Sequence, residues 1–275
     1  MSELALPGLW LPPRRQVLRK PWWLPGRPLA RRERDAADVL APAIGFDAEL
    51  GTNTGAGVSS LGVSVGTDKT SILTDAFLYI ARCNHGVTLN SVSDSEGNGW
   101  TVLGNKDDGA SHNIAVALMT TNSFGLSLGD NVSGVFSTTA TILAEVCCFS
   151  GFTHNGQALD QASPAASGTS TAPASANVTT LHANEVALGI IPYAGSATTF
   201  AAGTGFTKMP ASSFGSGTVQ QMGIEWQILS GTQTLNAAAT LGGPRTWAAA
   251  IFTIYDSGAT GGSTEHELSA CGAGH

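Results

Sequence analysis

Residues 221–229 read Gln-Met-Gly-Ile-Glu-Trp-Gln-Ile-Leu, and apolar side chains occupy every second position from Met222 to Ile228. The positions between them hold polar residues or Gly. In an extended strand, alternate side chains point to opposite faces. The stretch therefore predicts a β-strand with one face in a hydrophobic core and the other face, which carries Glu225, in solvent.

Similar apolar stretches recur at short intervals on either side, separated by turns rich in Gly, Ser and Asn. Ile142–Phe149 is an almost continuous apolar run, as expected for a strand buried on both sides. Cys147 and Cys148 are adjacent within it, so they should point to opposite faces. The other predicted strands are Val58–Val65, Ile72–Ala81, Val87–Val92, Trp100–Leu103, Asn113–Thr121, Glu185–Ile191, Gly205–Met209, Thr234–Leu241 and Trp247–Tyr255.

About ten short strands without helical patterns between them predict an all-β fold made of two packed antiparallel sheets. The absence of α/β alternation excludes Rossmann and TIM-barrel folds. Within the β-sandwich class we expect a jelly-roll-like architecture, because closed double sheets protect their edge strands. No run of about 18 apolar residues is present, so no membrane-spanning helix is expected.

The composition divides the chain into four parts. Residues 1–40 are predicted to be an extended N-terminal arm and residues 41–57, which end in a Gly-rich stretch, a flexible linker. Residues 58–256 are expected to form the β-sandwich domain, and residues 257–275 a flexible C-terminal tail. Within the sandwich, residues 153–177 are expected to form a long loop, and loops of that length are usually functional or mobile.

Charge is distributed unevenly between the arm and the rest of the chain. Residues 1–35 carry eight basic and three acidic residues, a net charge of +5, whereas residues 36–275 carry five basic and seventeen acidic residues, a net charge of −12. Pro occurs at positions 7, 12, 13, 21, 25 and 28, which prevents a helix and favours extended or polyproline geometry. Pro also interrupts every apolar run of the segment, so a secretory signal peptide is not indicated.

The arm combines aromatic and guanidinium side chains, which are enriched among the residues that anchor protein interfaces. We therefore predict that it docks on another protein. A nucleic-acid contact and a merely solvated tail are the weaker alternatives. The predicted docking residues are Trp10, Arg14, Arg15, Arg19, Trp22, Trp23, Arg27, Arg31 and Arg32.

Motifs for metal, nucleotide or covalent chemistry are incomplete. A His-Glu pair at 266–267 starts a zincin-like motif, but Ala270 stands where the second His would be. A Lys-Thr pair at 69–70 lacks the preceding Gly of a P-loop, and no Gly-x-Ser-x-Gly motif is present. Neither the six scattered His residues nor Cys83, Cys147, Cys148 and Cys271 have ligand spacing, so we predict no cofactor, no metal and buried thiols in a protein made in a reducing cytosol.

Two groups of acidic residues leave an alternative open. Glu145 and Glu225 lie within predicted strands and could face each other across a cleft, as a glycosidase would require. Oxygen-rich turns could hold calcium, although their spacing differs from an EF-hand loop and turn propensity alone explains them. These turn residues are Asp94, Glu96, Asn98, Asp107 and Asp108. Trp100, Trp226 and Trp247 are expected to be core residues rather than an exposed carbohydrate-binding platform.

Four short segments resemble a β-sandwich module that recurs in bacteriophage virion proteins and in some secreted bacterial proteins. They are Ser91–Thr101, Phe149–Phe152 with Leu159 and Asp160 downstream, Gly203–Thr207, and Trp247–Phe252. The resemblance spans residues 58–255 and consists of turns and strand ends, so it implies a fold more strongly than a function. The basic arm is similar to the extended arms by which phage structural proteins attach to a capsid or tail.

The resemblance implies a non-enzymatic structural protein of a tailed-phage virion, made in the host bacterial cytoplasm. Its expected partners are capsid, portal or tail proteins and further copies of itself, with trimers as the form that the resemblance suggests. Head decoration or cementing is favoured over a tail fibre, because the chain has no heptads or fibrous repeats. The alternatives are a tail-fibre or other receptor-binding module for a host-surface glycan, and a glycoside hydrolase.

Overall fold

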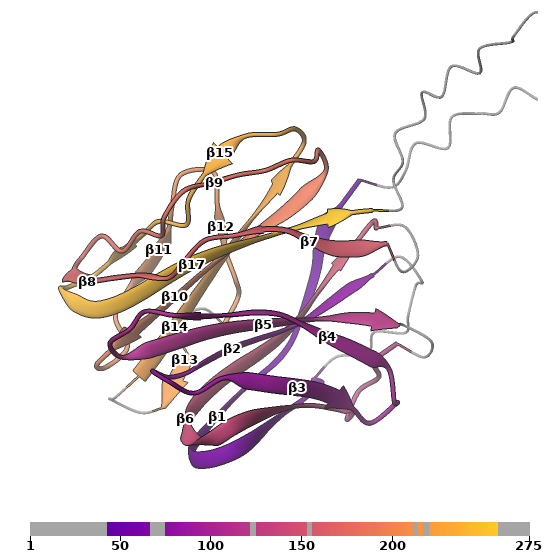
Figure 1. The fold of residues 1–275 in the computed structure, drawn as a ribbon, viewed down its shortest axis with the longest axis horizontal. Helices are drawn as coiled ribbons and strands as arrows, with labels where there is room; N and C mark the ends of the chain where they lie inside the picture. The colour runs from indigo at the N-terminus through magenta and orange to yellow at the C-terminus, as the bar shows by residue number, and fades with distance from the viewer. Residues whose placement is uncertain are drawn as a thin grey trace, which may run out of the picture. The chain divides into compact units, whose positions relative to one another are not determined.

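The computed structural model describes residues 43–66, 75–121, 125–152, 156–211, 214–216 and 220–257. All regular elements in these ranges are β-strands, as Figure 1 shows. The chain divides into two compact units, Met1–Val39 and Leu40–His275, and every described residue belongs to the second. In the described part of the chain there is no helix that could span a membrane.

Sheet I is built from the first half of this unit. Its strand order is β1 (Gly45–Ser64), β6 (Asn131–Ser150), β2 (Ala76–Asn84), β5 (His112–Thr121) and β4 (Gly99–Asp107), and β3 (Leu89–Asp94) pairs with the far part of β6. All of these pairs are antiparallel. Among the described strands of sheet I, only β4 and β5 pair as consecutive strands, so this sheet depends mainly on pairs between strands that are distant in the sequence.

Sheet II is built from the second half. Its strand order is β12 (Thr207–Lys208), β14 (Gln220–Leu229), β10 (Glu185–Ala194), β17 (Arg245–Asp256) and β7 (Gln157–Ala162). Two short strands extend it, β13 (Phe214–Ser216) on β14 and β8 (Ala166–Ser170) on β17. Its strand pairs are also antiparallel, so the prediction of an all-β fold with antiparallel sheets, consistent with a β-sandwich, is confirmed.

A central core joins the two sheets. Every second residue of β2 and of β17 contributes to it. Most of the residues between them are buried in other clusters, so these two strands lack a polar face. Cys147 points into this core and Cys148 points away from it, as their adjacency predicted. The central core includes Leu78, Ile80, Ile114, Val116, Leu118, Phe149, Val186, Leu188, Ile190, Met222, Ile224, Phe252 and Ile254.

The prediction of a flexible linker at residues 41–57 is wrong from Gly45 onward, because β1 begins there and runs for 20 residues. The Gly residues allow a bend within a strand. The register with β6 shifts between Gly55 and Val58, and Gly57 has a φ of 66°. After the bend β1 folds back along itself, so that the Asn53 amide donates to the Gly62 carbonyl at 2.6 Å.

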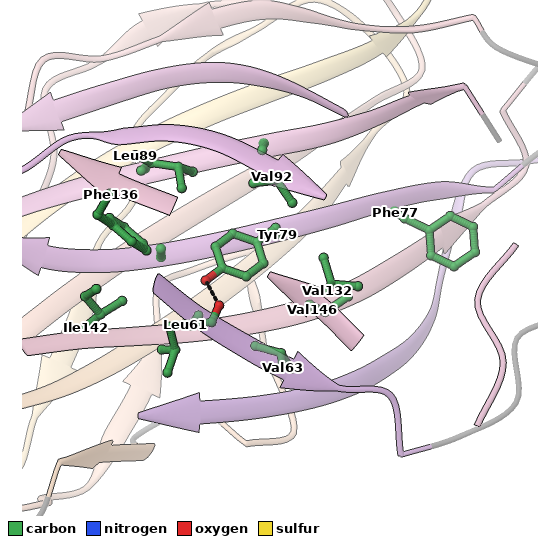
Figure 2. Close-up of a cluster of buried hydrophobic side chains, with 14 of the residues drawn as sticks. Leu61, Val63, Phe77, Tyr79, Leu89, Val92, Val132, Phe136, Ile142 and Val146 are labelled. Carbon is green, nitrogen blue, oxygen red and sulfur yellow. Dashed lines mark hydrogen bonds between the residues drawn. The ribbon is translucent and has the colours of Figure 1, made fainter. Parts of the chain in front are cut away.

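This bend rolls sheet I around a second core, the inner core. Leu61 and Val63 from the far part of β1 cover Phe77 and Tyr79 of β2, together with residues of β3 and β6. Figure 2 shows the buried Tyr79 hydroxyl donating to the Leu61 carbonyl, at 2.9 Å. A roll of this kind is packed with side chains, as in small β-barrels.

A cover layer lies on the face of sheet II that points away from sheet I. It consists of β9 (Val178–Thr179) paired with β15 (Thr234–Leu235), and β11 (Phe200–Ala202) paired with β16 (Ala239–Leu241). Figure 1 draws β9 and β15 at the top of the view. The predicted strand Thr234–Leu241 is thus two short strands, and the predicted solvent face of β14 is wrong, because Gln221 and Glu225 are buried.

The prediction of a long loop at residues 153–177 is also wrong within the described residues. β7 and β8 lie in that range and pair with opposite ends of β17. The Ser, Ala, Gly and Thr residues that suggested a loop are small, and in β7 and β8 they lie at the sheet edge beside bulky side chains of β17. Trp247 packs directly over Gly168, where a Cβ atom would lie 2.8 Å from the indole ring.

Candidate functional site

The predicted docking residues of the arm lie outside the described residues, as do His266 and Cys271. Sites can therefore be built only from the sandwich. Three kinds of polar group occur there: turns organised by Asp, carboxyl groups buried between layers, and a cationic cluster at one end of the central core.

Asp94 organises the turn that joins β3 to β4. Its carboxylate accepts hydrogen bonds from the backbone amides of Glu96 and Asn98, both at 3.0 Å, and from the Trp100 indole at 2.8 Å. Trp100 packs against the inner core, as predicted for a core Trp. Both oxygens of Asp94 are thus engaged by the protein itself, which favours a structural role for this turn over calcium binding.

Asp107 and Asp108 have the same kind of role at the turn between β4 and β5. Asp107 accepts from the amides of Gly86 and Gly109, each at 2.7 Å, and contacts the His85 ring. Burial acts to raise the pKa of Asp107, but hydrogen bonds from Gly86, His85 and Gly109 outweigh it and hold the pKa below its usual value.

The Asp108 carboxylate accepts from three successive amides, those of Ala110, Ser111 and His112, at 2.8 to 2.9 Å. Burial acts to raise the pKa of Asp108, but these amides outweigh it and keep the pKa below its usual value. His85, Asp107 and Asp108 are close enough for a metal ion, and so are Asp47, Asp75 and Cys148. In the His85 group the backbone already supplies donors to both carboxylates.

The two carboxyl groups that could have formed a glycosidase pair are separated by sheet II. Glu145 lies between Leu143 and Cys147 on the face of β6 that lines the central core. On β14, Ile224 and Trp226 point into that core, so Glu225 points to the opposite side, into the cover layer. Glu145 and Glu225 therefore cannot act on one substrate from two sides.

Glu225 holds the cover layer onto sheet II. Its Oε2 accepts from the Gly203 amide at 2.7 Å, and its Oε1 accepts from the Ala238 amide at 2.9 Å. Burial raises the pKa of Glu225 to about 7, although these two amides act in the opposite direction. A carboxyl group that bridges two backbone segments in this way is a structural group.

Glu145 is fully buried, and neither of its oxygens has a hydrogen-bond partner among the described residues. Burial raises its pKa well above the usual value, and the nearby Glu49 acts in the same direction. Both effects favour the protonated, uncharged form of Glu145. The Glu49 carboxylate accepts from the Ala211 amide at 2.6 Å, which ties β1 to the end of sheet II near β12.

A cationic cluster closes one end of the central core, and no sequence motif indicated it. Arg82 is 1 % exposed and donates to the Thr141 carbonyl at 3.1 Å. Burial lowers the pKa of Arg82 to about 10. His112 bridges the sheets, with Nδ1 3.4 Å from Asp108 Oδ2 and Nε2 3.2 Å from Gln220 Oε1. Burial, followed by the charge of Arg82, lowers the pKa of His112.

The remaining Trp residues are core residues, as predicted. Trp226 stacks on Phe46 with ring centroids 5.2 Å apart, which joins sheet II to β1. Trp247 is 8 % exposed, and its indole donates to the Ser170 hydroxyl of β8 at 3.0 Å. Neither ring is free to form a carbohydrate-binding platform. Cys83, Cys147 and Cys148 are buried free thiols, which agrees with their interpretation as small hydrophobic residues.

The polar groups described so far stabilise turns and layers rather than converge on a reacting atom. Comparisons with protein-family models, with curated proteins and with solved structures found no match to this chain. The functional argument therefore depends on the residues of the chain itself.

Proposed function

We propose that this chain is a non-enzymatic structural component of a tailed-phage virion. In this proposal residues 1–40 dock on a neighbouring capsid, portal or tail protein, and a jelly-roll-like sandwich decorates or cements the head. The observation that carries the proposal is the charge division, with a net of +5 in residues 1–35 and −12 in residues 36–275. Two parts with such different charge suit two different surroundings.

The energetics of docking favour a protein surface as the target of the arm. An extended segment pays an ordering cost when it binds, and burial of Trp10, Trp22 and Trp23 together with pairing of the Arg residues can offset that cost. The polar groups of the sandwich support a non-catalytic role, because the carboxylates of Asp94, Asp108 and Glu225 are engaged by backbone amides. The buried free thiols support synthesis in a reducing compartment.

The test compares incorporation into particles of the full chain and of a chain that lacks residues 1–40. The truncated chain should give the same β-sheet circular dichroism and a similar melting temperature, but it should be absent from purified virions. Copy number per particle, determined by quantitative mass spectrometry, is the readout. Full occupancy of particles by the truncated chain would overturn the proposal.

A double substitution tests the role of the aromatic residues. Trp22→Ala with Trp23→Ala should weaken binding to particles by about thirtyfold or more, because buried aromatic anchors commonly contribute 2 kcal/mol or more. Lys20→Ala, which removes one charge from the same segment, serves as the control and should have a smaller effect. A loss in the Lys20→Ala variant with unchanged binding by the double Trp variant would indicate that binding depends on charge, as for a nucleic-acid partner.

The receptor-binding alternative makes a different prediction for the same pair of proteins. A chain that binds a host-surface glycan through the sandwich should retain that binding after removal of residues 1–40. A glycan array probed with the full and truncated chains separates the two functions. Reproducible glycan binding by both, without any association of the full chain with particles, would favour the alternative.

A further inference from the structure

Two carboxyl groups from different strands hold one short turn at the edge of sheet II. The turn, residues 181–184, leads into β10. Its Leu181 amide donates to Asp160 Oδ2 of β7 at 2.8 Å, and its His182 amide donates to Glu185 Oε1 at 3.0 Å. The two carboxyl groups therefore accept from successive amides of the same turn, which joins β7 to β10.

The carboxyl groups are buried next to each other. The Asp160 side chain is 2 % exposed, and Glu185 is fully buried. Glu185 Oε2 has no hydrogen-bond partner among the described residues. Two adjacent buried carboxyl groups cannot both be charged without a large cost, because they repel each other in a medium of low dielectric constant. One proton shared between Asp160 and Glu185, whose side chains lie within hydrogen-bond reach of each other, removes this repulsion.

Aromatic stacking and backbone strain act on the same turn. The His182 ring stacks on Tyr255 of β17, with centroids 3.8 Å apart and an interplanar angle of 5°. Its Nε2 lies 3.9 Å from Asp160 Oδ1, and its side chain is 44 % exposed. Asn184 has a φ of 58°, a left-handed conformation that residues other than Gly seldom adopt.

The elements around the carboxyl pair supply few other charges. β17 contributes Thr253 and the phenol of Tyr255, and β14 places the apolar Leu229 opposite Glu185. The turn contributes His182, which is a cation only when protonated. A proton on Glu185 is thus the local means of reducing the negative charge of the pair.

We propose that Asp160, Glu185 and His182 form a proton-controlled latch that closes the turn 181–184 onto β7 and β10 and opens it when the shared proton is lost. This latch is independent of the function proposed above. In the closed state the protonated Glu185 donates to Asp160 while both carboxyl groups retain their backbone amides. Once the proton is lost, two buried carboxylates face each other, and their repulsion opens the turn, which then loses the contacts that maintain it.

The direction of the pH response follows from the pKa of Glu185. Burial, with Asp160 acting in the same direction, raises that pKa to about 7 from an ordinary value of 4.5. Because the folded chain holds this proton more tightly than the unfolded chain, the stabilising effect is complete below pH 4.5 and is lost as the pH rises through about 7. The latch therefore closes in mild acid and opens in mild base.

Amide hydrogen exchange in the full chain tests the latch. Protection of the Leu181 and His182 amides, corrected for intrinsic exchange, should fall on the order of tenfold between pH 6 and pH 8, as expected for one titrating group. Protection of the Leu188 amide, within β10, should change much less. Equal loss at all three amides would mean global unfolding and would overturn the proposal, as would constant protection of the turn.

Substitutions assign the effect to the carboxyl pair. Glu185→Gln keeps an acceptor for the His182 amide and provides a permanent donor to Asp160, so turn protection should become independent of pH. Asp160→Asn leaves Glu185 able to titrate but removes the neighbouring carboxyl group, so it should weaken the pH response, and it serves where Glu185→Gln does not fold. Glu225→Gln is the control, because it removes the other carboxyl group of sheet II with a pKa of about 7. A pH response of the turn that persists undiminished in both pair variants, or that disappears in the control, would contradict the latch.

Discussion

Gly223 shows how strongly a single residue of this fold is constrained by its neighbours. It lies on the face of β14 that the cover layer buries, and a Cβ atom built there would be 2.3 Å from the Phe200 ring. No side chain fits unless Phe200 moves. The sequence showed only that position 223 alternates with apolar residues, whereas the contact that requires Gly comes from a segment 23 residues earlier in the chain.

Gly223→Ala is expected to destabilise the domain by about 1–3 kcal/mol, because an added methyl group in a packed interior forces side chains or backbone to move. Urea denaturation followed by Trp fluorescence measures the change. Gly231→Ala, at a site with nothing within 4 Å of the added Cβ atom, is the control and should stay within about 0.5 kcal/mol. Similar stability of the two variants would show that Phe200 adjusts freely.

At the scale of the element, β3 and β4 are held together by a side chain where no backbone ladder joins them. The Asn105 amide donates to the Leu89 carbonyl at 3.1 Å, and its carbonyl oxygen accepts from the Leu89 amide at 2.8 Å. One residue of β4 thereby pairs with both backbone groups of a β3 residue. This contact helps close the roll of sheet I around the inner core.

Asn105→Ala should cost about 1–3 kcal/mol, because both polar groups of the buried Leu89 backbone lose their partner. Exchange of the Leu89 amide should accelerate more than that of amides in β2. Asn90→Ala, at an exposed position where the side chain accepts a hydrogen bond from the Thr88 hydroxyl, is the matched control and should have little effect. An unchanged Leu89 exchange rate in the Asn105 variant would show that water replaces the side chain.

Long strands also show the limits of sequence patterns at this scale. The apolar periodicity correctly predicted where β10, β14 and β17 lie, because each has a strong alternating or continuous apolar pattern. β1 was underestimated, since the Gly residues at 51, 55 and 57 were interpreted as a linker. In the structure a Cβ atom at Gly51 would be 2.4 Å from the Ser64 carbonyl oxygen. Gly51 therefore allows the two halves of β1 to pack closely against each other.

For the whole molecule, the buried carboxyl groups predict a stability that falls in mild base. Burial raises the pKa of both Glu185 and Glu225 to about 7, and it also raises the pKa of Glu145. A raised pKa means that the folded chain binds the proton more tightly, so stability is greatest below about pH 4.5 for these groups and falls as the pH passes 7. The lowered pKa values of Asp107 and Asp108 act in the opposite direction, and their contribution is lost in strong acid.

The melting temperature should therefore be lower at pH 8.5 than at pH 5.5, by about 4 °C or more, since one titrating group changes stability by up to about 1.4 kcal/mol per pH unit. Scanning calorimetry across this range measures the change. The combined Glu185→Gln and Glu225→Gln variant should have a flatter profile than the unsubstituted protein. A melting temperature that rises between pH 5.5 and pH 8.5 would contradict the assignment.

The sequence alone determined local features of the described part of this protein: the position of several long strands, the all-β class, the opposite directions of Cys147 and Cys148, and the packing of Trp100, Trp226 and Trp247 against the cores. These depend on the two-residue period of an extended chain, which is a local property. Only the tertiary structure decided which strand faces are covered and which carboxyl groups meet. Glu225 seemed solvent-exposed because the segments that bury it are distant in sequence, and Asp160 meets Glu185 only because β7 and β10 both pair with β17. Contacts of this kind follow from how distant segments pack, and no local pattern encodes them.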